Sequence, residues 1–299
     1  MESPEKTSDY DTQPPDIGIV IPAYNESKGI LPTIERLRAA LADAPFTWEL
    51  LIVDDGSSDD TYEKVKEMDL RIVRHDRNRG YGAALKTGLR SIRSPWFAII
   101  DADGTYPEEE LVRIAENREQ YDMIIGSRTG QSVHIPLIRR PAKAFMRKLA
   151  SYVAGIPIPD LNSGLRIMRR EVVEKYVHLL PDGFSFTTTI SLAMLTDGYR
   201  VKYEDINYLH REGKSKIRPI YDTLNFISLI LRMAIYFKPL KFFIPVALLL
   251  MLSGVGVLFG SWHFTGRIMD STSTILVMTG VQIFITGLMA ELIVRRSQR

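Results

Sequence analysis

Short apolar runs alternate with amphipathic stretches through the first half of the chain, and each apolar run ends in a polar loop. The runs with the length of buried strands are Ile17–Ile21, Glu49–Val53, Arg71–His75 and Trp96–Ile100. The stretches between them, with apolar residues at helical spacing, are Ser27–Ala42, Asp59–Met68 and Gly80–Ile92. This order predicts βαβ units, a mainly parallel sheet and ligand-binding loops at the carboxyl ends of the strands.

The pattern is less regular beyond these elements. Met123–Gly126 predicts another strand and Ala142–Ala154 a helix, and strand-like runs occur within Asp160–Arg170 and Arg200–Tyr208. Residues 217–241 mix apolar and basic side chains, which is typical of helices that lie in the headgroup region of a membrane.

Two long segments near the C-terminus, 242–262 and 271–292, are almost free of charge, and each is long enough to span a bilayer core. The basic residues beside them are Lys238 and Lys241 before the first, and Arg295, Arg296 and Arg299 after the second. The positive-inside rule therefore predicts a multi-pass protein of the cell (inner) membrane, with the large domain and the tail 293–299 in the cytoplasm. A hairpin buried in a globular core is the alternative. Gly256 and Gly260 allow helix pairing between copies of the chain.

Composition narrows the chemistry further. The 299 residues contain no cysteine, which excludes disulfides, thiolate nucleophiles and cysteine-based zinc sites. The five histidines show no metal-binding spacing, and a net charge of +2 does not indicate nucleic acid as a partner. Residues 1–15 are polar, acidic and proline-bearing, and predict a disordered leader.

Asp101 and Asp103 directly follow the apolar run 96–100. Two carboxylates one residue apart at a strand end can hold one hard divalent cation, Mg²⁺ or Mn²⁺, against a diphosphate. The alternative is a solvated acidic turn.

Asp54 and Asp55 end the second strand and suit hydrogen bonds to a ribose or base. A helix-capping cluster built on Ser58 or Asp59 is a compatible alternative. The first strand ends at the same sheet edge in Pro22–Glu26, which places Tyr24 and Glu26 where they could flank a base.

Basic residues that could neutralise phosphates lie in the second half. Arg128 follows a strand end, and Arg147 and Ser151 share one helix face. A surface salt bridge is the alternative for Arg147. The basic loop 210–216 either closes over a diphosphate or faces anionic lipid.

Several of these segments together resemble a known family. They are Pro22–Glu26, Asp54–Asp59, Asp101–Pro107, Gly126–Arg128, Asp160–Arg166 and Gly213–Lys216. Over roughly residues 16–216 the chain resembles the polyprenyl-phosphate glycosyltransferases, which include dolichyl-phosphate mannose synthase and the bacterial undecaprenyl-phosphate sugar transferases. The resemblance implies an α/β fold of the GT-A (Rossmann-like) type with a C-terminal two-helix transmembrane hairpin. It also implies inverting transfer of a hexose from a UDP- or GDP-sugar to undecaprenyl or dolichyl phosphate.

The resemblance also implies roles for individual residues. The implied nucleotide-sugar site consists of Pro22, Tyr24, Glu26, Val53, Asp55, Asp101, Ala102, Asp103, Arg211 and Lys216. The acceptor phosphate would bind Arg128, Arg147 and Ser151, the metal would bind Asp101 and Asp103, and catalysis would use Asp103, Asp160, Arg128 and Lys216. Thr105 stands where some relatives have a glutamine, and His210 rivals Arg211 as the basic residue.

A lipid phosphate is already anionic near neutral pH and needs positioning and charge shielding more than a base. Asp160 is then an optional base, an orienting group, or only a turn residue after Pro159. Two other functions stay open: glycosyl transfer to a hydroxyl acceptor such as a glycolipid or polysaccharide, and a non-catalytic membrane scaffold.

Overall fold

The computed structural model describes residues 13–128, 140–209, 219–266 and 270–297. The chain divides into two compact units. The first comprises 1–135, 159–194 and 199–215, and the second comprises 136–158, 195–198 and 216–299.

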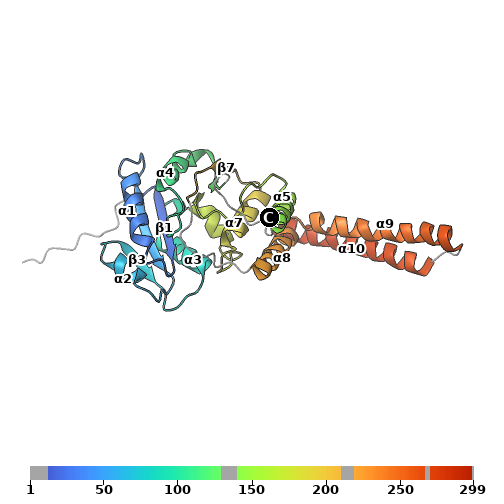
Figure 1. Ribbon diagram of the computed structural model, residues 1–299. Helices are drawn as coiled ribbons and strands as arrows, with labels where there is room; N and C mark the ends of the chain where they lie inside the picture. Colours follow the sequence, from blue (N-terminus) through green and yellow to red (C-terminus); the bar gives the residue numbers. More distant parts are fainter. Residues whose placement is uncertain (1–12, 129–139, 210–218, 267–269, 298–299) are drawn as a thin grey trace, which may run out of the picture. The chain divides into compact units, whose positions relative to one another are not determined.

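The first unit is built on a seven-stranded sheet with the strand order β3-β2-β1-β4-β6-β5-β7 (Figure 1). The strands are β1 (Ile17–Ala23), β2 (Trp48–Asp54), β3 (Arg71–Arg74), β4 (Trp96–Ile99), β5 (Met123–Ser127), β6 (Arg166–Arg169) and β7 (Val201–Asp205). β1 pairs in parallel with β2 and β4, β2 with β3, and β5 with β7. β6 is antiparallel to both of its neighbours, β4 and β5. The sheet is therefore mixed, and the predicted parallel order fails only at β6.

The direction of β6 follows from where its chain enters the sheet. Just before β6, the carbonyl of Leu165 accepts a hydrogen bond from the backbone N–H of Gly126, near the carboxyl end of β5. The hydroxyl of Ser163 donates to the carbonyl of the same Gly126. Residues 160–165 thus lie at the carboxyl edge of the sheet, and β6 runs away from that edge.

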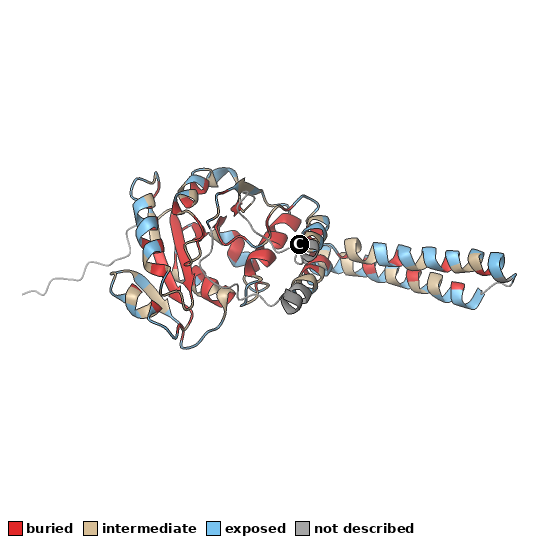
Figure 2. Cartoon of the chain, in the orientation of Figure 1, coloured by how far each residue is buried: buried red, intermediate tan, exposed pale blue. Residues whose placement is uncertain are grey.

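Helices pack on both faces of this sheet. They are α1 (Ile30–Leu41), α2 (Thr61–Lys66), α3 (Tyr81–Ser91), α4 (Glu108–Glu116), a 3₁₀ turn (Arg118–Gln120), α6 (Arg170–Tyr176) and α7 (Phe186–Thr196). α1 buries Ile30, Ile34, Leu37 and Leu41, as its helical spacing predicts, against the isoleucines of β1. Each such side chain contributes about 1.5–3 kcal/mol of hydrophobic stabilisation. Figure 2 shows the fully buried strands at the centre of this unit.

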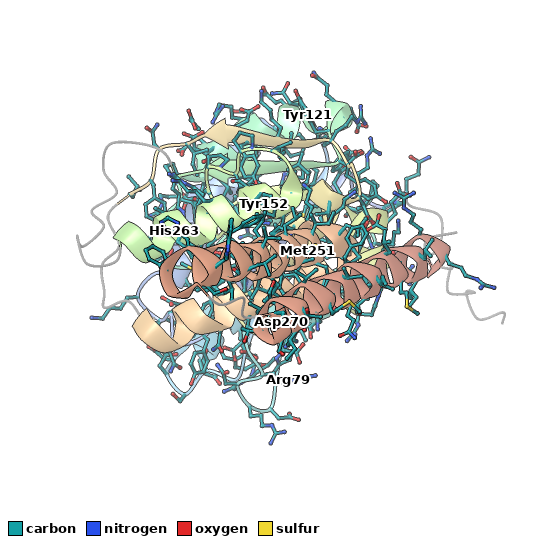
Figure 3. All side chains as sticks on the ribbon, turned by 90° about the vertical axis from the view of Figure 1, so that its right-hand side faces the viewer. Arg79, Tyr121, Tyr152, Met251, His263 and Asp270 are labelled. Carbon is teal, nitrogen blue, oxygen red and sulfur yellow. The ribbon has the colours of Figure 1, made fainter. Side chains whose placement is uncertain are left out.

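The second unit is helical in its described part. Its helices are α5 (Arg140–Ala154), α8 (Pro219–Phe237), α9 (Pro239–Thr265) and α10 (Asp270–Ser297). α9 and α10 form a closely packed hairpin, since a Cβ on Gly280 would lie 2.6 Å from the Cγ of Met251 (labelled in Figure 3) and 2.9 Å from the carbonyl oxygen of Ala247. Gly254 and Gly287 make similar contacts with the opposite helix.

The hairpin helices Pro239–Phe264 and Asp270–Arg296 are long and apolar enough to cross a membrane, with mean hydropathies of 2.5 and 1.8 over an apolar window of 18 residues in each. Only 11% of each apolar window is buried inside the protein. A helix from a globular core would be mostly buried, so the alternative of a buried hairpin does not fit.

Candidate functional site

The loops after β1 and β2 are joined by hydrogen bonds at the carboxyl edge of the sheet. The backbone N–H of Asn25 donates to the Ser57 hydroxyl at 3.0 Å, and the Asn25 side-chain oxygen accepts from the backbone N–H of Ser58 at 2.8 Å. The backbone N–H of Glu26 donates to the Thr61 hydroxyl at 3.0 Å. Tyr24 and Glu26 are half-buried here. The structure therefore brings the predicted Pro22–Glu26 and Asp54–Asp59 segments together.

The predicted capping cluster is present in part, because the N-cap residue of α2 is Asp60, whose side chain makes no capping hydrogen bond, whereas the carboxylate of Asp59 does bond the helix start. Oδ1 of Asp59 accepts hydrogen bonds from the backbone N–H of Thr61 at 3.1 Å and from the Thr61 hydroxyl, at the first residue of α2. Asp59 thus satisfies an N-terminal N–H of the helix, which leaves Asp55 for another role.

Asp55 is buried, and its carboxylate orders the loop between β3 and α3. Its Oδ1 accepts from the backbone N–H of Arg79 at 2.9 Å, and its Oδ2 from that of Gly80 at 2.7 Å (Arg79 is labelled in Figure 3). Oδ1 also lies 2.7 Å from Nδ1 of His75, whose Nε2 lies 2.9 Å from the Thr87 hydroxyl. A carboxylate has about four acceptor positions, so these contacts leave room for a hydrogen bond from a ligand.

Two residues of the implied nucleotide site have side chains inside the core. Val53 is fully buried on β2, and Ala102 is 2% exposed. Side chains so placed can help only by packing, so any direct contact of these residues with a nucleotide would be through the backbone.

Asp101 lies beyond the end of β4 and is held from two sides. The Tyr81 hydroxyl, at the start of α3, donates to Oδ1 of Asp101 at 2.9 Å. Burial, and then the charge of Asp101, raise the pKa of Tyr81, so this hydroxyl stays protonated as a donor. On the other side lies Gly164, where an added Cβ would come within 2.2 Å of Oδ2 of Asp101. The backbone N–H of Gly164 donates to the Tyr106 hydroxyl at 2.7 Å.

Asp103 is fixed by its own turn. The Thr105 hydroxyl donates to Oδ1 of Asp103 at 2.6 Å, and the Thr105 backbone N–H donates to the same oxygen at 3.2 Å. Gly104 between them has a φ of +67°, which glycine adopts without strain. Thr105 is 1% exposed, so it supports the Asp103 carboxylate from behind.

The donor set at this turn fits a hard divalent cation. Among the described residues, no three acidic or histidine side chains gather at one point. Mg²⁺ commonly binds through one or two carboxylates and completes its shell with substrate phosphates and water. Asp101 and Asp103 therefore suit a cation that arrives with a diphosphate rather than a cation held by the protein alone.

Arg128 and Asp160 form a bidentate ion pair at the end of β5. Nε of Arg128 donates to Oδ2 of Asp160 at 2.7 Å, and Nη2 donates to Oδ1 at 2.9 Å. Their side chains are 21% and 7% exposed. Burial works to raise the pKa of Asp160, but the hydrogen bonds and charge of Arg128 outweigh it and hold the pKa at about 2. Asp160 is therefore ionised and is a weak base.

Arg166 is a buried residue whose role the sequence does not reveal. Its guanidinium, fully buried, donates to the carbonyls of Ser163 and Thr187 and to the hydroxyl of Ser191. It therefore joins the 160–165 segment to α7. Arg166 ends the predicted Asp160–Arg166 segment, but nothing in the sequence indicates this buried role.

The remaining predicted site residues fall elsewhere. Arg147 and Ser151 lie one turn apart on α5 of the second unit, where Arg147 is exposed and the Ser151 hydroxyl accepts from the backbone N–H of Ile158 at 3.0 Å. Their grouping with Arg128 stays a prediction. His210, Arg211 and Lys216 lie outside the described residues.

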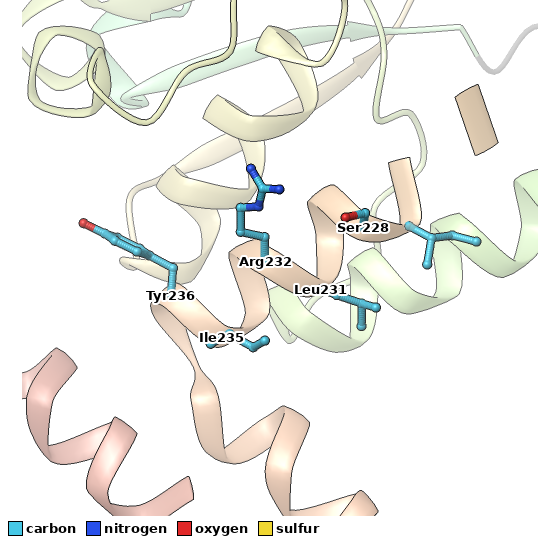
Figure 4. Close-up of a pocket in the computed structure, with 6 residues that line it drawn as sticks. Ser228, Leu231, Arg232, Ile235 and Tyr236 are labelled. Carbon is cyan, nitrogen blue, oxygen red and sulfur yellow. The ribbon is translucent and has the colours of Figure 1, made fainter. Parts of the chain in front are cut away.

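The second unit also carries an open hollow of about 560 Å³ along α8 (Figure 4). It is lined by Ile227, Ser228, Leu231, Arg232, Ile235 and Tyr236. The other side of α8 is buried through Ile230, Met233, Ala234 and Phe237. The hollow thus combines apolar side chains with one arginine and contains no carboxylate.

The mixed sheet, with its polar loops gathered at one edge, has the GT-A type of fold. A solved structure with this fold is glucosyl-3-phosphoglycerate synthase from Mycobacterium tuberculosis, in complex with Mn²⁺, UDP-glucose and phosphoglyceric acid. It aligns with a TM-score of 0.58 and 20% identity, over 74% of this chain and 80% of that one. The chain belongs to glycosyl transferase family 2, whose family model matches residues 18–177. The GtrB C-terminal hairpin model matches residues 238–295.

Relatives in this family are named for sugar transfer to polyprenyl phosphates. The dodecaprenyl-phosphate galacturonate synthase of Rhizobium johnstonii is 26% identical over 95% of this chain and 89% of its own length. The undecaprenyl-phosphate 4-deoxy-4-formamido-L-arabinose transferase of Photorhabdus laumondii is 26% identical over 93% and 89%. The dolichyl-phosphate hexose transferase of Haloferax volcanii is 28% identical over 68% and 87%. The predicted family and fold are confirmed, and the chain is a glycosyltransferase.

Proposed function

We propose that the protein transfers a hexose from a UDP- or GDP-sugar to a polyprenyl phosphate, such as undecaprenyl or dolichyl phosphate, with inversion at the sugar carbon. The observation that carries this proposal is the extent of the likeness to relatives named as polyprenyl-phosphate sugar transferases. It reaches 95% of the chain and so includes the apolar hairpin as well as the catalytic unit.

On the donor side, Asp101 and Asp103 would hold Mg²⁺ or Mn²⁺. The cation, when bound, neutralises the charge that develops on the departing nucleoside diphosphate. The Tyr81 hydroxyl and Gly164 fix the Asp101 carboxylate, and Thr105 fixes that of Asp103. Little reorganisation is then needed when the donor binds.

The nucleoside of the donor would lie against the joined loops after β1 and β2, between Tyr24, Glu26 and Asp55. The Asp55 carboxylate is already held by the Arg79 and Gly80 N–H groups, so its position is fixed before the ligand binds. Arg211, or its rival His210, together with Lys216, would supply charge to the donor phosphates.

On the acceptor side, Arg128, Arg147 and Ser151 would bind the lipid phosphate. Asp160 would act as an orienting group: both of its oxygens accept hydrogen bonds from Arg128, and its pKa of about 2 makes it a poor proton acceptor. A phosphate oxygen needs no base, whereas a hydroxyl acceptor does. This difference favours the phosphate acceptor over a glycolipid or polysaccharide hydroxyl.

The second unit would anchor the enzyme in the cell membrane, with the catalytic unit in the cytoplasm. α9 and α10 would span the bilayer, and α8 would lie among the headgroups, with Arg232 near lipid phosphates. Gly256 and Gly260 of α9 have no atom within 4 Å of an added Cβ, so they stay available for pairing with a second copy.

The test uses the purified full-length protein in detergent with undecaprenyl phosphate, Mg²⁺ or Mn²⁺, and a panel of radiolabelled nucleotide sugars. We expect organic-phase label from one donor, and its loss with EDTA or with Asp103→Ala. Asp43→Ala, which removes an exposed carboxylate away from the site loops, is the matched control and should keep full activity. Nucleotide binding without lipid labelling would instead support a hydroxyl acceptor. No nucleotide binding at all would support the scaffold.

A further inference from the structure

The loop before α7 is anchored on the first turns of α3. The carbonyl of Asp182 accepts a hydrogen bond from the backbone N–H of Ala83 at 3.0 Å, and its carboxylate pairs with Nζ of Lys86 at 2.7 Å. A Cβ on Gly82 would lie 2.1 Å from the carbonyl oxygen of Pro181. A contact this close requires glycine and fixes the loop against the helix.

This anchored loop presents an aromatic ring to solvent. The ring of Phe184 stacks on that of Tyr81, with centroids 5.6 Å apart and an interplanar angle of 17°. Phe184 is nevertheless 70% exposed, and the Tyr81 ring covers one face only. The Tyr81 hydroxyl in turn donates to Asp101. Phe184 therefore contacts Tyr81, and Tyr81 contacts Asp101, a carboxylate of the proposed metal site.

We propose that the open face of Phe184 is the platform on which the hexose ring of the donor stacks. The inference rests on the proposed function, because it requires a nucleotide sugar at Asp101. In such a donor the sugar is bonded to the phosphate farther from the nucleoside, next to the cation. A hexose has a face of C–H groups that packs well on an aromatic ring. Among the described loops, Phe184 is an exposed large apolar side chain that stacks on Tyr81, whose hydroxyl holds Asp101.

The geometry makes Phe184 a selective contact. It would touch the sugar and not the nucleoside, so it would distinguish a nucleotide sugar from the matching nucleoside diphosphate. If Phe184 only covered Tyr81, its loss would loosen Tyr81 and Asp101, and both ligands would bind less well to the same degree.

The experiment compares the wild type, Phe184→Leu and Phe184→Trp by calorimetric titration of the full-length protein with Mn²⁺ present. The ligands are UDP-glucose and UDP, or GDP-mannose and GDP if the wild type prefers guanine. We expect Phe184→Leu to weaken binding of the nucleotide sugar by about two- to ten-fold, the size of one stacked aromatic contact, and to leave that of the diphosphate unchanged. Phe184→Trp, which keeps a ring, should retain the wild-type ratio.

Equal weakening of both ligands, or of neither, would overturn the platform. So would a rise in the KM for polyprenyl phosphate as the sole effect, since Phe184 would then contact the acceptor. Failure of the proposed function has a different signature, because the wild type would then not label lipid. The binding of the nucleotide sugar relative to the nucleoside diphosphate would still test the role of Phe184.

Discussion

Gly164→Ala should displace a carboxylate of the proposed metal site without removing it. The added Cβ would lie 2.2 Å from Oδ2, 2.6 Å from Cγ and 2.7 Å from Oδ1 of Asp101, so it meets the whole carboxylate. The backbone of Gly164 cannot easily retreat, because its N–H donates to the buried hydroxyl of Tyr106. The strain must therefore be relieved by Asp101.

The size of the movement follows from these distances. An ordinary van der Waals contact begins at 3.4 Å, so the nearest oxygen must move by about 1.2 Å if Gly164 stays in place. That displacement also stretches or breaks the 2.9 Å hydrogen bond from Tyr81. A misplacement of about 1 Å at a catalytic group can lower the rate by about 100-fold. We expect a loss of this order in kcat, and a higher Mn²⁺ concentration for half-maximal activity.

The assay is organic-phase labelling of polyprenyl phosphate across a Mn²⁺ titration, with thermal unfolding as a check on folding. Asp43→Ala is the control: Asp43 is exposed and lies away from the site loops, and the activity of this variant should stay within about two-fold of wild type. A folded Gly164→Ala protein with wild-type kcat and metal dependence would refute the argument, since Asp101 would then tolerate displacement.

Two further predictions concern stability. Asp160→Asn removes the charge that pairs with Arg128. The lowering of the Asp160 pKa from 3.8 to about 2 is equivalent to roughly 2 kcal/mol, and urea unfolding should show a loss of this order. Because the pKa of Asp160 is lowered on folding, its contribution to stability is complete above about pH 4 and is lost as the pH falls from 3.8 through 2. The Asp160→Asn variant should lack this contribution to the loss of stability in acid. Gly280→Ala should destabilise the hairpin by about 1–3 kcal/mol, because its Cβ would overlap Met251, whereas Gly256→Ala should have no such effect. Equal thermal unfolding of these two variants in detergent would contradict the packing.

Sequence periodicity located the elements that have one buried face. α1 is amphipathic, so its buried positions recur at helical spacing and predict the helix. α7 is different, because Thr187, Thr188, Thr189 and Ser191 are buried along with its apolar residues. A helix buried all round has no contrast between its faces, and three consecutive threonines favour strands. The sequence pattern therefore did not predict α7.

The site could be predicted in part for a related reason. Parallel strands gather their carboxyl ends at one edge, so residues directly after β1, β2 and β4 can be placed together from chain order alone. The Arg128–Asp160 pair joins residues 32 positions apart, across a segment that includes α5 of the other unit. Its partners depend on the reversed direction of β6, which no local pattern encodes. The contact between Asp101 and Gly164 depends on the same antiparallel direction of β6.

The direction of β6 also explains how the proposed donor and acceptor sides are held by one segment of the chain. Because β6 starts at the carboxyl edge, the short segment before it reaches both sides: Asp160 holds Arg128, and Gly164 seats Asp101. Arg166 ties this segment to α7 through the carbonyl of Thr187. A parallel strand in this place would enter from the opposite edge and leave both contacts unmade. Under the proposed function, the segment 160–166 would therefore fix the distance between the cation at Asp101 and Arg128, the arginine proposed for the lipid phosphate.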